Sequence, residues 1–181
     1  MSVTAPQTQQ LTAQFHTLQQ SVIDACAQCV DFISELDHKG FTASSSERSS
    51  IGAHTRHVID FMLCFFKGLE TGVIDYDARE RHEGTEKSPE TATSLLHHMQ
   101  KRFHMLTLED EREHLQVSET VNSEGEKVAV PTSLNRELMM LLSHTIHHLG
   151  IMKILAEDLG FSLGNNVGKA HATVVYEQQQ A

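Results

Sequence analysis

The 181-residue chain has no tryptophan, two tyrosines, three prolines and three cysteines, namely Cys26, Cys29 and Cys64. An odd and sparse set of cysteines does not form a disulfide framework and is typical of a reducing compartment. Residues 1–10 are polar and lack both the basic start and the apolar centre of a signal peptide. We therefore expect a cytoplasmic protein without such a peptide.

Positive charge and long apolar runs are also scarce. Lysine and arginine number 14 against 24 acidic residues, which gives a formal net charge of −10. Phosphate backbones are repelled by such a chain, so we expect no nucleic-acid partner. The richest apolar stretch, residues 58–66, is interrupted by Asp60 and is much shorter than the roughly 20 residues that span a bilayer. The pattern therefore predicts no membrane segment.

Histidine, in contrast, is abundant: the chain has thirteen. Several of them cluster in three short segments, at residues 54–57, 97–98 and 144–148, and the others are scattered. Imidazole is a common ligand of divalent transition metals. The clustering therefore directs attention to a metal site.

Four long segments have apolar residues at every third or fourth position, the signature of a helix with one buried face. They are residues 8–36, 47–71, 88–109 and 132–160. Thr132 or Ser133 is a suitable cap for the last helix, and Glu137 stands near the position of a capping-box acid. The sequence thus predicts four helices.

The connections between these segments differ in kind. Residues 72–88 are polar and irregular, which predicts a long crossover loop. Residues 115–121 and 127–130 form two short runs around a turn, which predicts a small hairpin. We therefore predict one all-α domain, residues 1–181, folded as a four-helix bundle with long crossover connections and a small β-hairpin between helices three and four. Residues 162–181 are expected to form an irregular tail.

Within the fourth helix, His144 and His148 are four residues apart, so both rings lie on one face and could share a metal ion. His148 also falls on the apolar stripe that points into the bundle. A buried imidazole must be hydrogen-bonded or metal-bound, because an unsatisfied one costs a few kcal/mol. The alternative is that hydroxyls such as Ser143 and Thr145 satisfy both rings.

The second helix supplies the candidates for a third ligand, His54 and His57. His54 lies within the apolar arc of this helix and His57 at its edge, so periodicity prefers His54. A ligand at the edge is also acceptable at the mouth of a bundle, where a substrate enters. Asp60, one turn further, is placed to orient a neighbouring ring.

Other metal patterns fail. Thr145 stands where a His-Glu-x-x-His protease needs its glutamate. A di-iron carboxylate bundle needs two inward Glu-x-x-His motifs, and only Glu111-x-x-His114 occurs, in a polar stretch. Cys26-x-x-Cys29 lies inside a predicted helix without a second cysteine pair, so we interpret both residues as small core residues.

The histidine motifs resemble those of the DinB superfamily, which includes the YfiT-like metal-dependent hydrolases. The resemblance covers most of the chain and rests on four segments: Ser50-Ile-Gly-Ala-His-Thr-Arg-His57-Val-Ile-Asp60, Ser143-His144-Thr-Ile-His-His148, Tyr76-Asp77-x-Arg79-x-Arg81 with Glu86, and Arg136-Glu137-Leu138. It implies His57, His144 and His148 as ligands of a nickel, zinc or iron ion, with His54 as the substitute for His57. It also implies that the protein forms a homodimer.

Three imidazoles leave a coordination position open for water or a substrate thiolate. The first functional hypothesis is a metal-dependent hydrolase of a small amide or ester, with Asp60 or Glu137 as acid or base. The alternatives are a metal-dependent transferase acting on a low-molecular-weight thiol, and a non-catalytic, metal-stabilised binding module.

Two arginines of the crossover loop, Arg79 and Arg81, suggest a site for an anionic group of a small-molecule substrate. The alternative is that they pair with Glu83 or Glu86. Metal binding requires neutral imidazoles, so we expect metal retention to fall below about pH 6.5.

Overall fold

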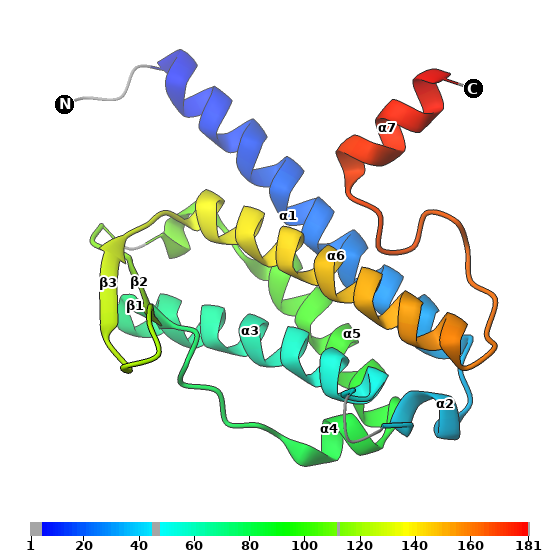
Figure 1. Cartoon of the computed structure of the whole chain (residues 1–181). Coiled ribbons are helices and arrows are strands. Elements are labelled where there is room, and N and C mark those ends of the chain that lie inside the picture. Colours follow the sequence, from blue (N-terminus) through cyan, green and yellow to red (C-terminus); the bar gives the residue numbers. More distant parts are fainter. Residues whose placement is uncertain (1–4, 45–47, 112, 181) are drawn as a thin grey trace.

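The computed structural model describes residues 5–44, 48–111 and 113–180. Its four long helices are α1 (Ala5–Ser34), α3 (Ile51–Thr71), α5 (Pro89–Met105) and α6 (Leu134–Asp158) (Figure 1). Each corresponds to one of the four segments predicted from apolar periodicity. The expected all-α four-helix bundle is therefore confirmed.

Serine side chains determine where three of these helices begin. Ser50, Ser88 and Ser133 each accept a hydrogen bond from the backbone N–H three residues further on, which satisfies one of the free donors of a helix N-terminus. Because Ser133 is the cap, Glu137 lies one residue beyond the capping-box position. Its carboxylate makes different contacts, described below.

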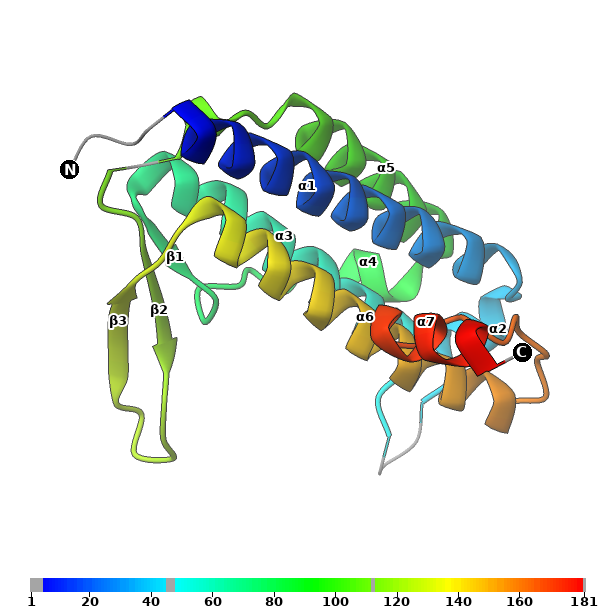
Figure 2. The same cartoon turned by 90° about the horizontal axis from the view of Figure 1, so that it is seen from above.

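The helices form two layers, α1 beside α5 and α3 beside α6 (Figure 2). Helices α1 and α6 run in one direction, and α3 and α5 run in the other (Figures 1 and 2). Since α3 and α5 are parallel neighbours, the chain between them must return along the whole bundle. The predicted crossover between helices two and three is thus a requirement of this topology.

This returning segment is more regular than the sequence predicts. It contains a short strand, β1 (Val73–Asp75), and a short helix, α4 (Glu83–Lys87). A further short helix, α2 (His38–Thr42), follows α1 and was not predicted. The returning chain approaches α3 closely at Gly52, where a Cβ atom would lie 2.1 Å from the carbonyl oxygen of Glu86.

The predicted hairpin is present as β2 (Gln116–Thr120) and β3 (Lys127–Pro131), which pair antiparallel with Val117 opposite Val130. Gly125 has a φ of 81° in the turn between them, a conformation that suits glycine. Strand β1 adds to the other edge of β2 in parallel, with Ile74 opposite Val117. The result is a three-stranded sheet at the end of the bundle where α6 begins (Figure 1).

The core has two packed clusters, one toward the sheet around Phe65 and Phe103 and one toward the other end around Phe41 and Leu149. Helix α6 contributes to both. In the described part of the chain it is also the one helix with the length and composition to cross a membrane, although its longest uninterrupted apolar run, residues 138–142, is far shorter than a bilayer span. Its buried face includes Glu137 and His148 and packs against α1 and α3, as expected of the core helix of a bundle.

The end of the chain corrects the prediction of an irregular tail at residues 162–181. Residues 161–170 are largely irregular, but His171–Gln180 form helix α7, which has no buried residue and projects from the bundle. Alanine, glutamate and glutamine favour helix even without a packing face. An apolar pattern was the signal used for the other helices, and α7 lacks one.

Candidate metal centre

Three histidines from two neighbouring helices meet inside the bundle. His57 of α3 and His144 and His148 of α6 each present a ring nitrogen within 4.8 Å of the other two. The ring centroids lie 5.0 Å apart for His57 and His144, 4.7 Å for His57 and His148, and 4.5 Å for His144 and His148. We call these three residues the histidine cluster.

Helix geometry explains how α6 supplies two of the three rings. His144 and His148 are one turn apart and therefore face the same side, toward α3. His148 is buried, as its place on the apolar stripe predicts, and His147 between them is exposed. Neither Ser143 nor Thr145 is bonded to these rings in the described residues, so the hydroxyl alternative is wrong.

Burial keeps the cluster neutral. Desolvation, followed by the neighbouring His144 and Arg79 charges, lowers the pKa of His57 to about 4. The same main cause lowers the pKa of His144 to about 4 and that of His148 to about 3. The three rings are therefore uncharged at neutral pH, which is the form that binds metal ions.

Two rings of the cluster have a hydrogen-bond partner. The Nδ1 atom of His148 lies 3.1 Å from Nδ1 of His54, and Nδ1 of His57 accepts a 2.7 Å hydrogen bond from the Arg79 guanidinium. His54 and His57 both reach this region because they are three residues apart on α3. Neither contact could be predicted from the sequence pattern.

The third ring is the exception. Nε2 of His144 is buried and has no hydrogen-bond partner among the described residues. Buried polar atoms nearly always have a partner, and one without needs an explanation. A divalent ion shared with His57 and His148 would satisfy this nitrogen, because neutral imidazoles are good ligands for zinc, nickel and iron. The residues therefore fit a divalent metal, although its identity is not fixed by three imidazoles.

Aromatic stacking connects the cluster to the returning segment. The Phe61 ring stacks on His144 with a centroid separation of 4.1 Å and on Tyr76 with a separation of 4.8 Å. The Tyr76 hydroxyl donates a 2.7 Å hydrogen bond to the Glu137 carboxylate. This chain of contacts fixes the position of the segment that carries Arg79.

Glu137 is fully buried, and its known partners satisfy both oxygens. Thr132 and Arg136 donate to Oε1, at 2.5 Å and 2.7 Å, and Tyr76 donates to Oε2. Burial, with the adjacent Glu137 charge and hydrogen bond, raises the pKa of Tyr76 above its usual range. No bond joins Glu137 to a cluster histidine in the described residues. The contacts give this carboxylate an anchoring role.

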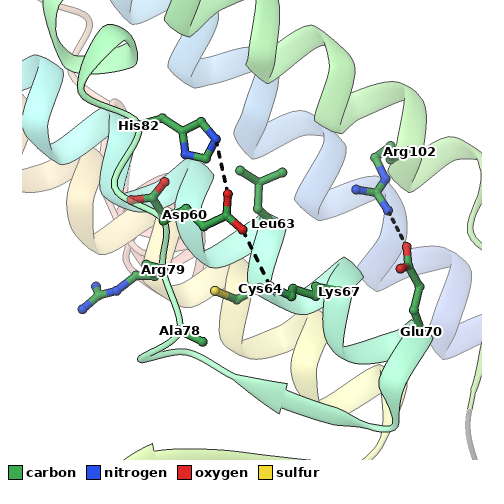
Figure 3. A pocket seen from close by; sticks show the side chains of 10 residues that line it. Asp60, Leu63, Cys64, Lys67, Glu70, Ala78, Arg79, His82 and Arg102 are labelled. Carbon is green, nitrogen blue, oxygen red and sulfur yellow. Dashed lines mark ion pairs between the residues drawn. The ribbon is translucent and has the colours of Figure 1, made fainter.

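Asp60 behaves differently. Its side chain is buried and has no hydrogen-bond partner among the described residues, and desolvation raises its pKa against the opposing charge of Arg56. It does not orient a cluster ring, as the sequence suggested, because Arg79 holds the Nδ1 of His57. Instead Asp60 lines a pocket of about 220 Å³ together with Cys64, Lys67 and Arg79 (Figure 3).

The ion pairs of Glu83 and Glu86 answer one question about the returning segment. Glu86 pairs with Arg56 and Glu83 with Lys87, so the alternative that these acids pair with Arg79 and Arg81 is wrong. Arg79 turns to His57, and Arg81 is exposed in a left-handed conformation with a φ of 49°. In Figure 3 the Arg79 guanidinium points away from Cys64 and Lys67.

Comparisons with known proteins agree with the architecture. No family model matches the chain, and a search of curated proteins found no match. Among solved structures, the chain is similar to YfiT from Bacillus subtilis, described as a probable metal-dependent hydrolase with an unusual four-helix bundle topology. The TM-score is 0.60 at 14% identity, over 89% of this chain and 92% of YfiT. The chain therefore has a YfiT-like four-helix bundle fold.

Proposed function

We propose that this protein is a divalent-metal-dependent hydrolase that acts on a small amide or ester carrying an anionic group. The observation that carries the proposal is the histidine cluster, with its neutral rings and the unpartnered Nε2 of His144. The description of YfiT as a probable metal-dependent hydrolase supports the same reaction class. The metal is nickel, zinc or iron, the ions that a set of neutral imidazoles suits.

The residues have separate tasks in this proposal. His57, His144 and His148 hold the ion, and His54 keeps the His148 ring in place through their Nδ1 contact. When bound, a divalent ion polarises a carbonyl group and lowers the pKa of water to about 7. The cluster leaves room for this chemistry because three protein ligands do not complete a coordination shell.

The pocket lined by Asp60 and Arg79 supplies the remaining groups in this proposal. Asp60 is the better of the two candidate acids or bases, because its carboxylate is free to exchange a proton and Glu137 is held by three donors. Arg79 and Arg81 lie on the segment that borders this pocket and bind the anionic group of the substrate. Guanidinium groups suit carboxylates because they donate two parallel hydrogen bonds.

The first experiment measures metal content by elemental mass spectrometry on protein purified without a histidine tag or chelator. We expect about one divalent ion per chain, and none in the His57→Ala/His144→Ala variant. His97→Ala/His98→Ala is the matched control, since it removes two exposed histidines of α5. Absence of metal from the unaltered protein, even after addition of nickel, zinc and iron, would contradict the proposal and leave a non-catalytic binding module as the remaining hypothesis.

The second experiment tests the reaction. Metal-loaded protein is offered p-nitrophenyl esters and N-acetyl amino acids, and product release is followed. Hydrolysis that requires the metal supports the proposal. Consumption of a low-molecular-weight thiol with an electrophile, without any hydrolysis, would instead identify a thiol transferase.

A further inference from the structure

Arg79 is an unusual neighbour for a metal ligand. Its guanidinium donates to Nδ1 of His57 and lies with its central carbon 5.3 Å from the centroid of the Phe61 ring. In the described part of the chain no carboxylate forms an ion pair with it, and its buried Nε has no hydrogen-bond partner. A positive charge therefore sits, without a counter-charge in contact, on the ring proposed to bind the ion.

The chemistry of this hydrogen bond decides which nitrogen of His57 is available. A guanidinium group has only donors, so Nδ1 of His57 must accept with its lone pair. In a neutral imidazole the other nitrogen, Nε2, then carries the hydrogen. While Arg79 is bonded, the neutral ring of His57 has no lone pair left for a metal ion.

Electrostatics act in the same direction. A divalent ion bound by His57 would stand close to the Arg79 charge in a half-buried site, where like charges repel more strongly than in water. The contact of Arg79 and the binding of the ion at His57 are therefore mutually exclusive.

We propose that Arg79 competes with the divalent ion for His57, and that loading of the site releases the guanidinium to bind the anionic group of the substrate. This inference rests on the proposed function, since it requires the histidine cluster to be a metal site. It adds an order of events: an anionic substrate meets a free Arg79 guanidinium only where the ion is already bound.

The path of the chain makes such a release feasible. Arg79 lies on the returning segment between β1 and α4, outside any regular element. Tyr76 holds one end of this segment through Glu137, and α4 packs on α3 at the other end. The side chain of Arg79 can therefore change partners while both anchors remain.

Metal affinity tests the competition directly. Zinc is titrated into the full-length protein in competition with a chromophoric chelator, and the unaltered chain is compared with Arg79→Met, which keeps the packing on Phe61 but cannot donate. We expect Arg79→Met to bind zinc about tenfold more tightly, because a charge-assisted hydrogen bond no longer has to be broken. Arg81→Ala removes the same charge two residues away and should change the affinity by less than about twofold.

The outcomes separate this inference from the proposed function. Zinc bound by Arg79→Met with the same or lower affinity than by the unaltered chain would overturn the competition and leave the metal site standing. Failure of both proteins to bind zinc, nickel and iron, titrated in the same way, would overturn the proposed function and this inference with it. Zinc binding by Arg79→Met and not by the unaltered chain would support the competition, because Arg79 would then exclude zinc completely.

Chemical labelling tests the release without any activity assay. Phenylglyoxal modifies free guanidinium groups, and peptide mass spectrometry reports the rate at each arginine. We expect zinc to accelerate modification of Arg79 and to leave Arg56, which pairs with Glu86, unchanged. Unchanged or slower modification of Arg79 in the loaded protein would overturn the release.

Discussion

The imidazoles of His54 and His148 are joined at Nδ1 across the interface of α3 and α6, 3.1 Å apart. One of these nitrogens donates and the other accepts, so the contact couples the tautomers of the two rings and restrains their orientation. If His148 is the donor, its Nε2 keeps the lone pair that a metal ion requires. In the proposed metal site, His54 is therefore a positioning residue for the His148 ring.

Removing this partner should weaken metal binding without abolishing it. For His54→Ala we expect about a tenfold loss in zinc affinity. This is the lower end of the effect seen when the hydrogen-bond partner of a metal-bound histidine is removed. Chelator competition measures it, with the exposed His97→Ala as the control. A complete loss of metal would instead make His54 itself a ligand, the choice that helix periodicity favours.

The pH dependence of metal retention should differ from that of free histidine. The cluster rings have pKa values of about 4, 4 and 3 for His57, His144 and His148, so protons compete with the ion only in that range. We expect metal to stay bound at about pH 5.5 and to be lost toward about pH 4, lower than the sequence alone predicts. Elemental analysis after dialysis at each pH measures it, and half-loss near 6.5 would contradict the burial of the rings.

The same pKa shifts affect stability. A histidine whose pKa is lowered by folding binds protons more readily in the unfolded chain, so acid favours unfolding. The stability of the metal-free protein should be constant above about pH 6.5 and fall between that value and about pH 4. Melting curves from pH 8 to 4 measure this, and His148→Asn should make the fall in melting temperature below about pH 6.5 smaller. A melting temperature that rises on acidification would have the wrong sign.

Asp60 is expected to act on protons and not on the ion. Replacement by asparagine keeps the shape and removes the ionisable group, so kcat for hydrolysis should fall about a hundredfold while zinc content stays at one per chain. The metal content of the same sample is measured as the control, so that a loss of activity is not confused with a loss of zinc. Loss of zinc from Asp60→Asn would show that the carboxylate supports the cluster instead.

The close approach of the returning chain predicts a sharp requirement at Gly52. A Cβ at this position would lie 2.1 Å from the Glu86 carbonyl oxygen, so Gly52→Ala must push α4 away from α3. We expect a loss of about 1–3 kcal/mol in the free energy of unfolding, measured with urea. Gly84→Ala, where a Cβ has open space, is the control and should not destabilise the protein.

Glu137 should matter for stability more than for chemistry. Glutamine in its place turns an acceptor into a donor toward Tyr76 or toward Thr132 and Arg136, and we expect a cost of about 1.5–3 kcal/mol from the loss of charged hydrogen bonds. Urea unfolding measures it, with the exposed Glu124→Gln as the control. Unchanged stability together with lost activity would return Glu137 to the catalytic role considered from sequence.

Much of this architecture follows from local patterns. Apolar periodicity predicts the four long helices, and capping serines mark where three of them begin. The spacing of His144 and His148 places both rings on one face of α6 whatever the rest of the fold does. Short elements such as α2, β1 and α4 escape this reasoning because five, three and five residues repeat the helix or strand period too few times for a pattern to be recognised.

The sequence by itself thus determined the four long helices and the placement of two histidines on one face of α6, since both depend on residues a few positions apart. Only the tertiary structure decided which ring of α3 meets them, that His54 touches His148, and that Arg79 reaches His57. Those contacts depend on how α3 is rotated against α6 and on the path of a segment that must return between two parallel helices. Neither is encoded in local periodicity, because each results from the packing of distant parts of the chain.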